Sequence, residues 1–230
     1  MKLFYAPRIY LKMKRDFWLE RWERKEIGFH QSDINPYLRQ YWQELHLARD
    51  SEVFVPLCGK SSDLLWLHKQ GHPVLGVELS AIAAQAFFEE NGYAPHRYAS
   101  GKFACYEADG IRTLCGDFFD LSKDDMAKVS AVYDRASLVA LPPDMRERYV
   151  CHLVSILPTA AQMLLVTFDY PQSEMPGPPF AVSPGEVEAL YRPHAEIRHL
   201  AQLDVLSQNK RFQERGLSQL QENIFRMTLH

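Results

Sequence analysis

The stretch FVPLCGKSSDLLWL, residues 54–67, decides how the rest of this sequence is interpreted. An apolar run rich in strand-forming residues leads into Gly59, Lys60 and Ser61, and a helical pattern follows. Gly-Lys-Ser is also the end of the phosphate-binding loop of nucleoside triphosphatases. The first question is therefore whether this strand–turn–helix unit binds a phosphate or a different ligand.

A phosphate-binding loop requires the pattern G-x-x-x-x-G-K-[ST], because its backbone N–H groups surround the phosphates. The first glycine of that pattern falls on Phe54, and Pro56 has no N–H group to donate. The dinucleotide pattern G-x-G-x-x-G fails as well, since Gly59 stands alone. The sequence thus argues against a triphosphatase and against a nicotinamide-dependent reductase.

The composition excludes further classes of protein. The chain has 230 residues, of which 47% are hydrophobic, and this content is sufficient for a full core. Its net charge is −3 and it has no long basic run, so we expect no nucleic acid partner. No stretch reaches the roughly 18 apolar residues of a membrane span, and no membrane partner is expected either.

The cysteines give no sign of a metal site or of a disulfide scaffold. Cys58, Cys105, Cys115 and Cys151 form no C-x-x-C pair, and no Cys/His cluster has zinc spacing. We therefore expect no metal, and we predict reduced cysteines in a cytoplasmic protein. Cys58 lies beside the Gly-Lys-Ser turn, but we interpret it as a small packing residue.

Strand patterns alternate with helical patterns along most of the chain, which predicts βαβ units and a mostly parallel sheet. The predicted helices cover residues 16–24, 36–47, 62–70, 80–91, 143–157 and 183–190. The predicted strands cover residues 52–57, 73–79, 102–110, 111–119, 129–134, 161–170, 195–206 and 222–230. Asp109-Gly110 is a hairpin turn signal, and the last two strands suggest an antiparallel edge. Ligands of such sheets bind beyond the carboxyl ends of the strands.

An acidic residue marks the end of the second predicted strand. Glu78 follows Gly59 by nineteen positions, the spacing at which nucleotide-binding folds place the acid that binds ribose hydroxyls. A ribose-binding acid without a phosphate-binding loop indicates an adenosine cofactor that carries no phosphate, such as S-adenosylmethionine. Asp117 and Phe118 could then bind the exocyclic amine and cover the ring of adenine. The alternatives are a solvated strand end for Glu78 and a helix cap or turn for Asp117.

Four stretches taken together resemble the thiopurine S-methyltransferase family, in its bacterial form. They are FVPLCGKSSDLLWL, GHPVLGVELS, YDRASLVAL and PGPPF, and an N-terminal W-x-x-x-W…G-F-H-Q pattern matches too. The resemblance runs from Asp16 to the C-terminus and leaves residues 1–15 as a flexible arm without a counterpart. It implies a single domain over residues 16–230, with residues 16–50 as a helical lid over the cofactor.

The resemblance implies an α/β fold, the class I S-adenosylmethionine-dependent methyltransferase fold. This fold has a seven-stranded, mostly parallel sheet with helices on both faces and an antiparallel edge. The implied activity is methyl transfer from S-adenosylmethionine to the sulfur of small aromatic and heterocyclic thiols such as thiopurines. Bacterial members are also associated with selenium and tellurium acceptors, and members are usually monomers. A catalytically silent module that only binds S-adenosylmethionine is the alternative.

The family motifs also imply cofactor-binding residues. Trp18 and Phe29 should close over the cofactor, whereas Trp22 is interpreted as part of an amphipathic stripe. Leu57 and Gly59 should line the cofactor. Glu78 should hold the ribose, and Asp117 with Phe118 should lie at the adenine.

The family motifs also imply two arginines that bind the substrate. Arg135 should contact both cofactor and substrate and stabilise a thiolate, and Arg211 is the best match for a second arginine, with Arg215 as its competitor. Phe29 and Phe180 should contact the substrate, because Phe180 follows a rigid Pro/Gly segment and could stack on a flat ring. Asp134 is a possible proton acceptor through water.

Overall fold

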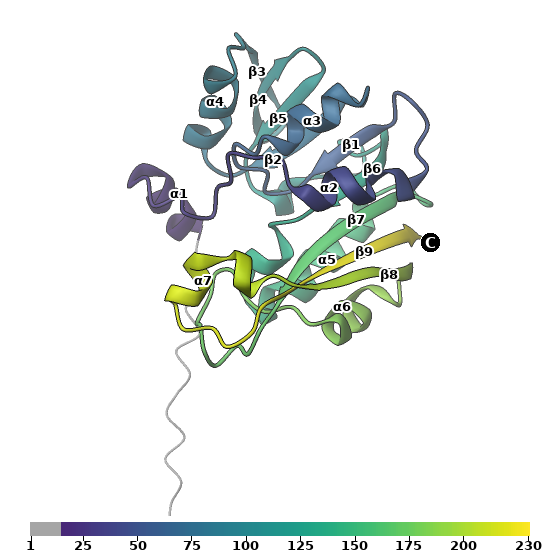
Figure 1. Ribbon diagram of the computed structural model, residues 1–230. Helices are drawn as coiled ribbons and strands as arrows, with labels where there is room; N and C mark the ends of the chain where they lie inside the picture. Colours follow the sequence, from purple (N-terminus) through teal and green to yellow (C-terminus); the bar gives the residue numbers. More distant parts are fainter. Residues whose placement is uncertain (1–14) are drawn as a thin grey trace, which may run out of the picture.

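The computed structural model describes residues 15–230, and these form a single nine-stranded sheet covered by helices (Figure 1). The strands are β1 (Glu52–Val55), β2 (Val74–Glu78), β3 (His96–Ser100), β4 (Phe103–Ala108), β5 (Ile111–Cys115), β6 (Val129–Asp134), β7 (Gln162–Asp169), β8 (Ala195–Asp204) and β9 (Gln221–Leu229). The α-helices are α1 (Arg15–Glu23), α2 (Pro36–Tyr41), α3 (Asp63–Lys69), α4 (Ala81–Glu90), α5 (Pro143–Ile156), α6 (Pro184–Tyr191) and α7 (Lys210–Glu214). The predicted arm lies outside the described residues, except for its last residue, Arg15, which begins α1.

The strand order is β3-β4-β5-β2-β1-β6-β7-β9-β8. The strands from β5 to β7 in this order pair in parallel, and β9 and β8 add an antiparallel edge. This confirms the predicted fold class, and the seven-stranded arrangement is present from β5 to β8. Two further strands, β3 and β4, extend it through antiparallel pairs. The sequence did not predict β3, because its residues are mostly exposed and polar.

Helices cover both faces of the sheet, as predicted. One buried cluster joins α2, α3 and α4 to one face, where Leu38, Leu64 and Phe87 pack. A second cluster joins α5 and α6 to the other face, where Tyr149 and Val187 pack. Figure 1 shows α2 and α3 in front of the sheet and α5 behind it. Each face therefore buries apolar side chains, which explains why the central strands are continuously apolar.

Most helix boundaries follow the capping signals in the sequence. The Ser80 hydroxyl accepts a hydrogen bond from the Ala83 N–H at the start of α4, and Asn35 caps α2 just before Pro36. The helix predicted for residues 36–47 is shorter, because α2 ends at Tyr41 and a 3-10 turn continues to residue 45.

The chain changes direction at β1, which lies between β2 and β6. From β1 the chain builds the sheet first toward β2 and later toward β6. The turns that follow β1 and β6 therefore diverge to opposite sides, and a crevice opens between them. This is the position in the fold where a ligand is expected.

A buried histidine joins the N-terminal helices to the sheet. The Trp42 indole Nε1–H donates to His72 Nε2 over 3.1 Å, and His72 Nδ1 lies 3.0 Å from the Ser51 carbonyl oxygen. Both contacts are satisfied by a neutral imidazole that carries its proton on Nδ1. Burial lowers the pKa of His72, and the hydrogen bond to Ser51 opposes this only in part. A protonated ring would place a second N–H against the indole.

We predict that this contact makes the fold sensitive to acid. Because the folded-state pKa of His72 lies below its ordinary value of 6.5, its contribution to stability is complete above that pH. The contribution is lost as the pH falls through the lowered pKa. Urea unfolding between pH 5 and pH 7.5 should show a steeper loss of stability for the wild type than for His72→Phe. Parallel curves for the two proteins would contradict the prediction.

Candidate active site

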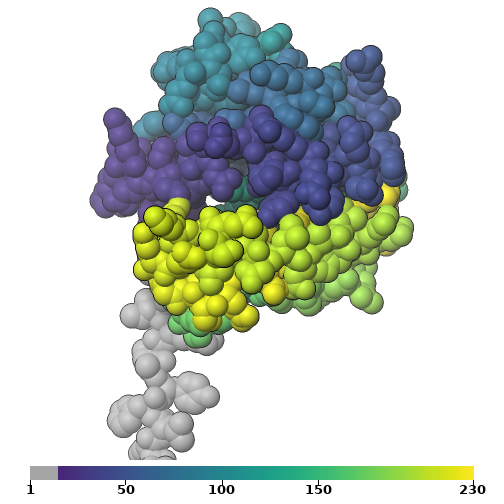
Figure 2. Space-filling model, in the orientation of Figure 1, coloured from purple at the N-terminus to yellow at the C-terminus, as the bar shows by residue number. Residues whose placement is uncertain are grey.

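A pocket lies beyond the carboxyl ends of β1 and β6, and its empty space is about 520 Å³, part of it open to solvent. Three segments line it: the turn after β1, the end of β6 and the loop after α1. The lining residues are Trp22, Phe29, His30, Gln31, Val55, Pro56, Leu57, Cys58, Gly59, Lys60, Ser61, Asp63, Tyr133, Arg135 and Ala136. Figure 2 shows the surface hollowed between the purple N-terminal segment and the yellow C-terminal segment.

The turn after β1 has a backbone shape that limits its sequence. Leu57 and Gly59 both have positive φ, at 45° and 55°. A Cβ at Gly59 would lie 3.3 Å from the Trp22 ring, so glycine allows both the backbone angle and the close approach of the tryptophan. Cys58 is buried and its sulfur packs against Gly76, which agrees with its interpretation as a packing residue.

Glu78 holds this turn in place. Its side chain is 6% exposed, and its carboxylate accepts hydrogen bonds from the Gly59 N–H at 2.8 Å and the Ser80 N–H at 2.7 Å. Burial raises the pKa of Glu78, and these backbone hydrogen bonds work against the rise. Glu78 is therefore a buried acid at the end of β2 and not a solvated strand end. It is not among the residues that line the pocket, and it reaches the pocket only through the turn that it holds.

The loop after α1 forms the aromatic wall of the pocket. Phe29 is 37% exposed and packs between Trp18 and Trp22, with ring centroids 5.4 Å and 5.6 Å away. Phe29 and Trp22 line the pocket, whereas Trp18 supports Phe29 from outside. The sequence analysis favoured Trp18 over Trp22 as the residue next to the cofactor. Two tryptophans four positions apart share a helix face, so the sequence could not show that Trp22 is the one that packs against Gly59.

Arg135 and Asp134 lie on opposite sides of the end of β6. Arg135 lines the pocket and is half-buried, and none of the ion pairs found among residues 15–230 includes it. Asp134 is 1% exposed, and its carboxylate accepts hydrogen bonds from the Ser137 N–H and the Tyr149 hydroxyl. Asp134 thus fixes the turn after β6 from the opposite face, and this position does not favour a role as proton acceptor.

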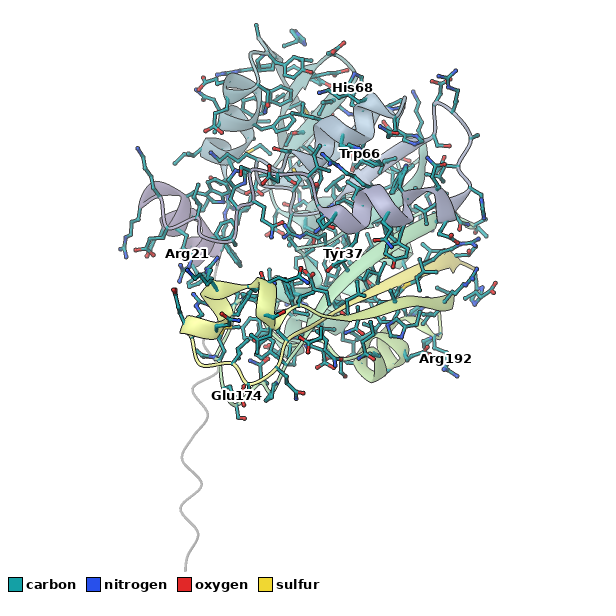
Figure 3. All side chains as sticks on the ribbon, in the orientation of Figure 1. Arg21, Tyr37, Trp66, His68, Glu174 and Arg192 are labelled. Atoms are coloured by element: carbon teal, nitrogen blue, oxygen red, sulfur yellow. The ribbon has the colours of Figure 1, made fainter. Side chains whose placement is uncertain are left out.

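The two candidates for a second substrate arginine are both exposed. Arg211 lies in α7 and Arg215 follows it directly. The Arg211 guanidinium contacts the carbonyl oxygen of Gly28, directly before the aromatic wall. Arg215 lies 3.3 Å from the Met175 sulfur. Neither arginine lines the pocket. Figure 3 shows Arg21 extending from α1 toward α7.

The residues expected at the adenine lie next to the pocket region but serve local structure. The Asp117 carboxylate accepts a hydrogen bond from the Phe119 N–H and caps a short 3-10 turn. Phe118 is buried in the core, 4.7 Å from the Tyr149 ring centroid. Neither side chain lines the pocket, so their adenine role stays a prediction that the geometry does not favour.

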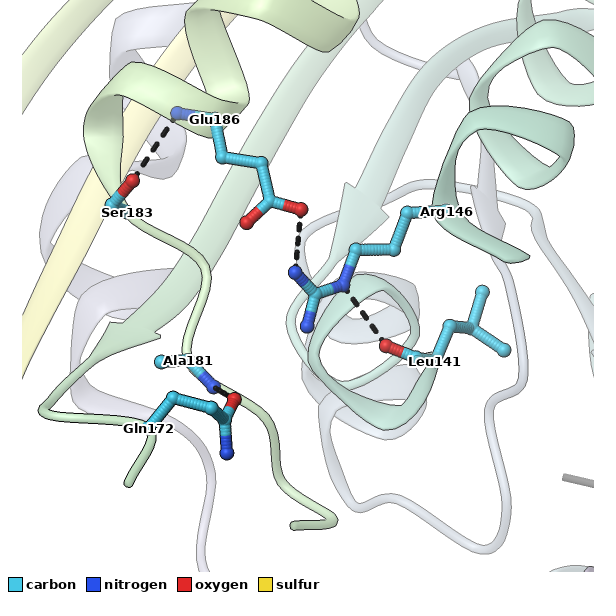
Figure 4. A network of polar contacts seen from close by, with 6 residues as sticks. All are labelled: Leu141, Arg146, Gln172, Ala181, Ser183 and Glu186. Carbon is cyan, nitrogen blue, oxygen red and sulfur yellow. Dashed lines mark hydrogen bonds and ion pairs between the residues drawn. The ribbon is translucent and has the colours of Figure 1, made fainter. Parts of the chain in front are cut away.

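Phe180 belongs to a fixed loop behind the pocket. Its backbone N–H donates to the Val139 carbonyl oxygen at 2.7 Å, and the Arg146 guanidinium lies 5.9 Å from its ring centroid. Nearby, the Ala181 N–H donates to the Gln172 side chain, as Figure 4 shows together with the contacts of Arg146. Backbone and side-chain contacts hold the loop, but Phe180 is not among the residues that line the pocket.

Sequence analysis missed several polar residues of the pocket. Asp63 accepts hydrogen bonds from the Asn35 N–H and the Tyr133 hydroxyl, and thereby connects the N-terminal segment to β6. Lys60 contacts both carboxylate oxygens of Glu90. His30 also lines the pocket. His30 belongs to the G-F-H-Q pattern and Lys60 to the G-K-S pattern, but neither pattern indicated what these two residues do in the pocket.

Comparison with known sequences gives the family. The sequence model described as Thiopurine S-methyltransferase (TPMT) matches residues 13–230. The chain belongs to the thiopurine S-methyltransferase family. The thiopurine S-methyltransferase of Nitrosospira multiformis is 62% identical over 213 residues, which cover 93% of this chain and 97% of that protein. That of Pseudomonas fluorescens strain Pf0-1 is 49% identical over 215 residues, covering 94% and 99%.

Two solved methyltransferases share the fold. The 1,6-didemethyltoxoflavin-N1-methyltransferase of Burkholderia thailandensis, solved with S-adenosylhomocysteine, aligns with a TM-score of 0.62 at 16% identity and covers 100% of this chain and 92% of its own. A methyltransferase of Anabaena variabilis aligns with a TM-score of 0.63 at 12% identity, covering 94% and 95%. The protein is therefore an S-adenosylmethionine-dependent methyltransferase.

Two further observations concern the described residues only. No helix within residues 15–230 is both long and apolar enough to cross a membrane. The same part of the chain contains no group of three or more His, Cys, Asp and Glu side chains placed to hold a metal ion.

The pocket fits the family cofactor. The turn offers no anion-binding cradle, which suits a molecule whose charges are a sulfonium and an amino acid group. Glu78, held against the turn by its two backbone hydrogen bonds, would have lone pairs left for ribose hydroxyls. Phe29 and Trp22 supply flat apolar surface over the turn.

We predict that Glu78→Gln weakens cofactor binding by roughly ten- to a hundred-fold, since hydrogen bonds to a charged group contribute about 1.5–3 kcal/mol. The amide of the glutamine would also direct its own N–H group toward the N–H of Gly59 or of Ser80, so one of these two hydrogen bonds would be lost. Calorimetric titration with S-adenosylhomocysteine measures the effect. Glu107→Gln on the exposed part of β4 is the matched control. Equal affinities for the two variants would refute the role of Glu78.

Proposed function

We propose that this enzyme transfers the methyl group of S-adenosylmethionine to the sulfur of aromatic and heterocyclic thiols such as thiopurines. The observation that carries this proposal is the position of Arg135, a half-buried guanidinium in the pocket that Gly59 and Phe29 line. A guanidinium there suits an acceptor that reacts as an anion. The names of the relatives, thiopurine S-methyltransferases, support the same acceptor class.

The proposed reaction is an in-line displacement at the sulfonium methyl group. Glu78 would hold the ribose, while the turn at Leu57 and Gly59 would position the cofactor beside it. Phe29 would cover both cofactor and acceptor, so that acceptor sulfur, methyl carbon and leaving sulfur lie in line. Such orientation is worth roughly 7–11 kcal/mol of the barrier.

Arg135 would act by stabilising the thiolate. Thiols react as thiolates, and a nearby cation favours the ionised form. Of the two cations that line the pocket, Lys60 is paired with Glu90, at 2.7 Å and 2.8 Å from its carboxylate oxygens. Arg135 therefore has its charge available for the acceptor. Arg211 or Arg215 would be a second substrate arginine, if the acceptor extends toward α7.

The same chemistry extends to other acceptors. A selenol or tellurol is a more polarisable analogue of a thiol and ionises more readily, so an anion-stabilising pocket suits it as well. We therefore include selenium and tellurium species in the proposed acceptor range. A small acceptor agrees with a pocket of this size, and we propose that the enzyme works as a monomer in the cytoplasm, where cysteine thiols remain reduced.

The alternative is a catalytically silent protein that only binds S-adenosylmethionine. Such a protein would need Glu78 and Gly59, but it would not need a cation facing the space above the cofactor turn. The presence of Arg135 in the pocket therefore favours the enzyme.

We predict that Arg135→Ala lowers kcat/KM for 6-mercaptopurine by roughly a hundred-fold or more, the usual cost of removing a group that stabilises developing or transferred charge. Transfer of labelled methyl from S-adenosylmethionine measures the rate. Arg198→Ala, an exposed arginine on β8, is the matched control.

Three outcomes distinguish Arg135 as the anion-stabilising residue, another arginine in that role, and the silent cofactor-binding protein. Strong loss in Arg135→Ala alone supports the assignment. Undiminished transfer in Arg135→Ala, with loss in Arg211→Ala or Arg215→Ala, would move the anion-stabilising role to that arginine. Cofactor binding without transfer to any thiol, selenide or tellurite would establish the silent module.

A further inference from the structure

One side chain of the pocket has a proton-accepting group and no role so far. His30 follows Phe29 in the aromatic wall, is half-buried and lines the pocket together with Arg135. Its position is fixed through the main chain, because its N–H donates to the Ile27 carbonyl oxygen at 2.8 Å in a tight turn. His30 therefore belongs to the part of the pocket lining that the segment after α1 contributes.

The charges around His30 come from three elements. Lys60 follows β1, Glu90 ends α4 and Arg135 follows β6, and all three act on the imidazole. Burial lowers the pKa of His30, Lys60 and Arg135 lower it further, and Glu90 opposes them in part. Asp63 is the acid that lines the pocket, but its two carboxylate oxygens accept hydrogen bonds from the Asn35 N–H and the Tyr133 hydroxyl. Burial and the two cations thus favour the unprotonated imidazole, whose free ring nitrogen can accept a proton.

We propose that His30 is the proton acceptor for acceptor thiols that enter the pocket in their protonated form. This inference rests on the proposed function, since it concerns the proton of the same thiol. The two carboxylates considered for this role are less suitable. Asp134 faces the opposite side of the sheet and Asp63 is engaged in holding the structure together.

The proposed step balances in atoms and charge. The S–H bond of the thiol breaks and its proton passes to an unprotonated ring nitrogen of His30. The sulfur lone pair forms the new S–CH₃ bond, and the methyl–sulfonium bond breaks with its electron pair staying on the leaving sulfur. The products are a methyl thioether, neutral S-adenosylhomocysteine and an imidazolium. The positive charges of Lys60 and Arg135 then favour release of that proton to solvent.

The division of labour follows from the acidity of the acceptor. An acidic aryl thiol arrives as a thiolate and needs only Arg135. A weakly acidic thiol arrives with its proton and needs His30 as well. The two residues therefore differ in which acceptors depend on them, and this difference can be measured.

The test compares His30→Gln with the wild type at pH 7 on two acceptors, 4-nitrobenzenethiol, which is fully ionised, and phenylmethanethiol, which is protonated. Glutamine keeps a polar side chain but cannot take up the proton. We expect a loss of roughly a hundred-fold in kcat with phenylmethanethiol, the usual contribution of a general base, and a much smaller change with 4-nitrobenzenethiol. His96→Gln, an exposed histidine on β3, is the control. S-adenosylhomocysteine affinity and melting temperature report whether the pocket is intact.

The pH profile supplies a second readout. With phenylmethanethiol, the variant should regain rate as the pH rises toward thiol ionisation, while the wild type should already be active near neutral pH. Equal losses with both thiols, or no loss with either, would overturn the inference while leaving the proposed function in place. A wild type that methylates neither these thiols nor 6-mercaptopurine would overturn the proposed function itself, and the inference with it.

Discussion

The pocket depends on the hydrogen bond between the Glu78 carboxylate and the Gly59 N–H. This bond connects the end of β2 to the turn after β1, and the Ser80 N–H binds the same carboxylate. It fixes a turn in which two residues have positive φ, a shape that a short loop would not hold by itself. A buried carboxylate is costly, and here the cost is offset by backbone donors at 2.7 Å and 2.8 Å.

The position of that turn also organises the N-terminal segment. Because Gly59 has no side chain, Trp22 approaches it closely, and Trp22 in turn supports Phe29. Asp63, one turn further along, accepts from the Asn35 N–H and so holds the other end of the same segment. The turn after β1 and the aromatic wall are therefore joined by contacts at both ends of the N-terminal segment.

Much of this arrangement could be predicted from the sequence, and the exceptions have physical causes. The central strands and most helices carry clear periodicity and caps, so the fold class follows from them. The exposed strand β3 has no apolar pattern and was missed. Strand ends and motifs mark Gly59 and Arg135, which line the pocket, and Glu78, which is buried behind its turn. Trp22 and His30 could not be predicted, because their approach to the pocket depends on how the N-terminal segment folds back over the sheet.

The charge balance of the reaction explains why the site combines a cation with an unprotonated base. A thiolate and a sulfonium are opposite charges, and methyl transfer between them leaves two neutral products. In the proposed reaction, Arg135 would favour the thiolate before transfer and would lose its charged partner afterwards, which would assist release of the thioether. A protonated thiol carries one proton more than a thiolate. Methyl transfer to it therefore leaves an additional positive charge in a pocket that already holds Arg135 and Lys60. An imidazole whose pKa is lowered by burial and by those cations would release that proton readily, and a pocket partly open to solvent would provide its exit.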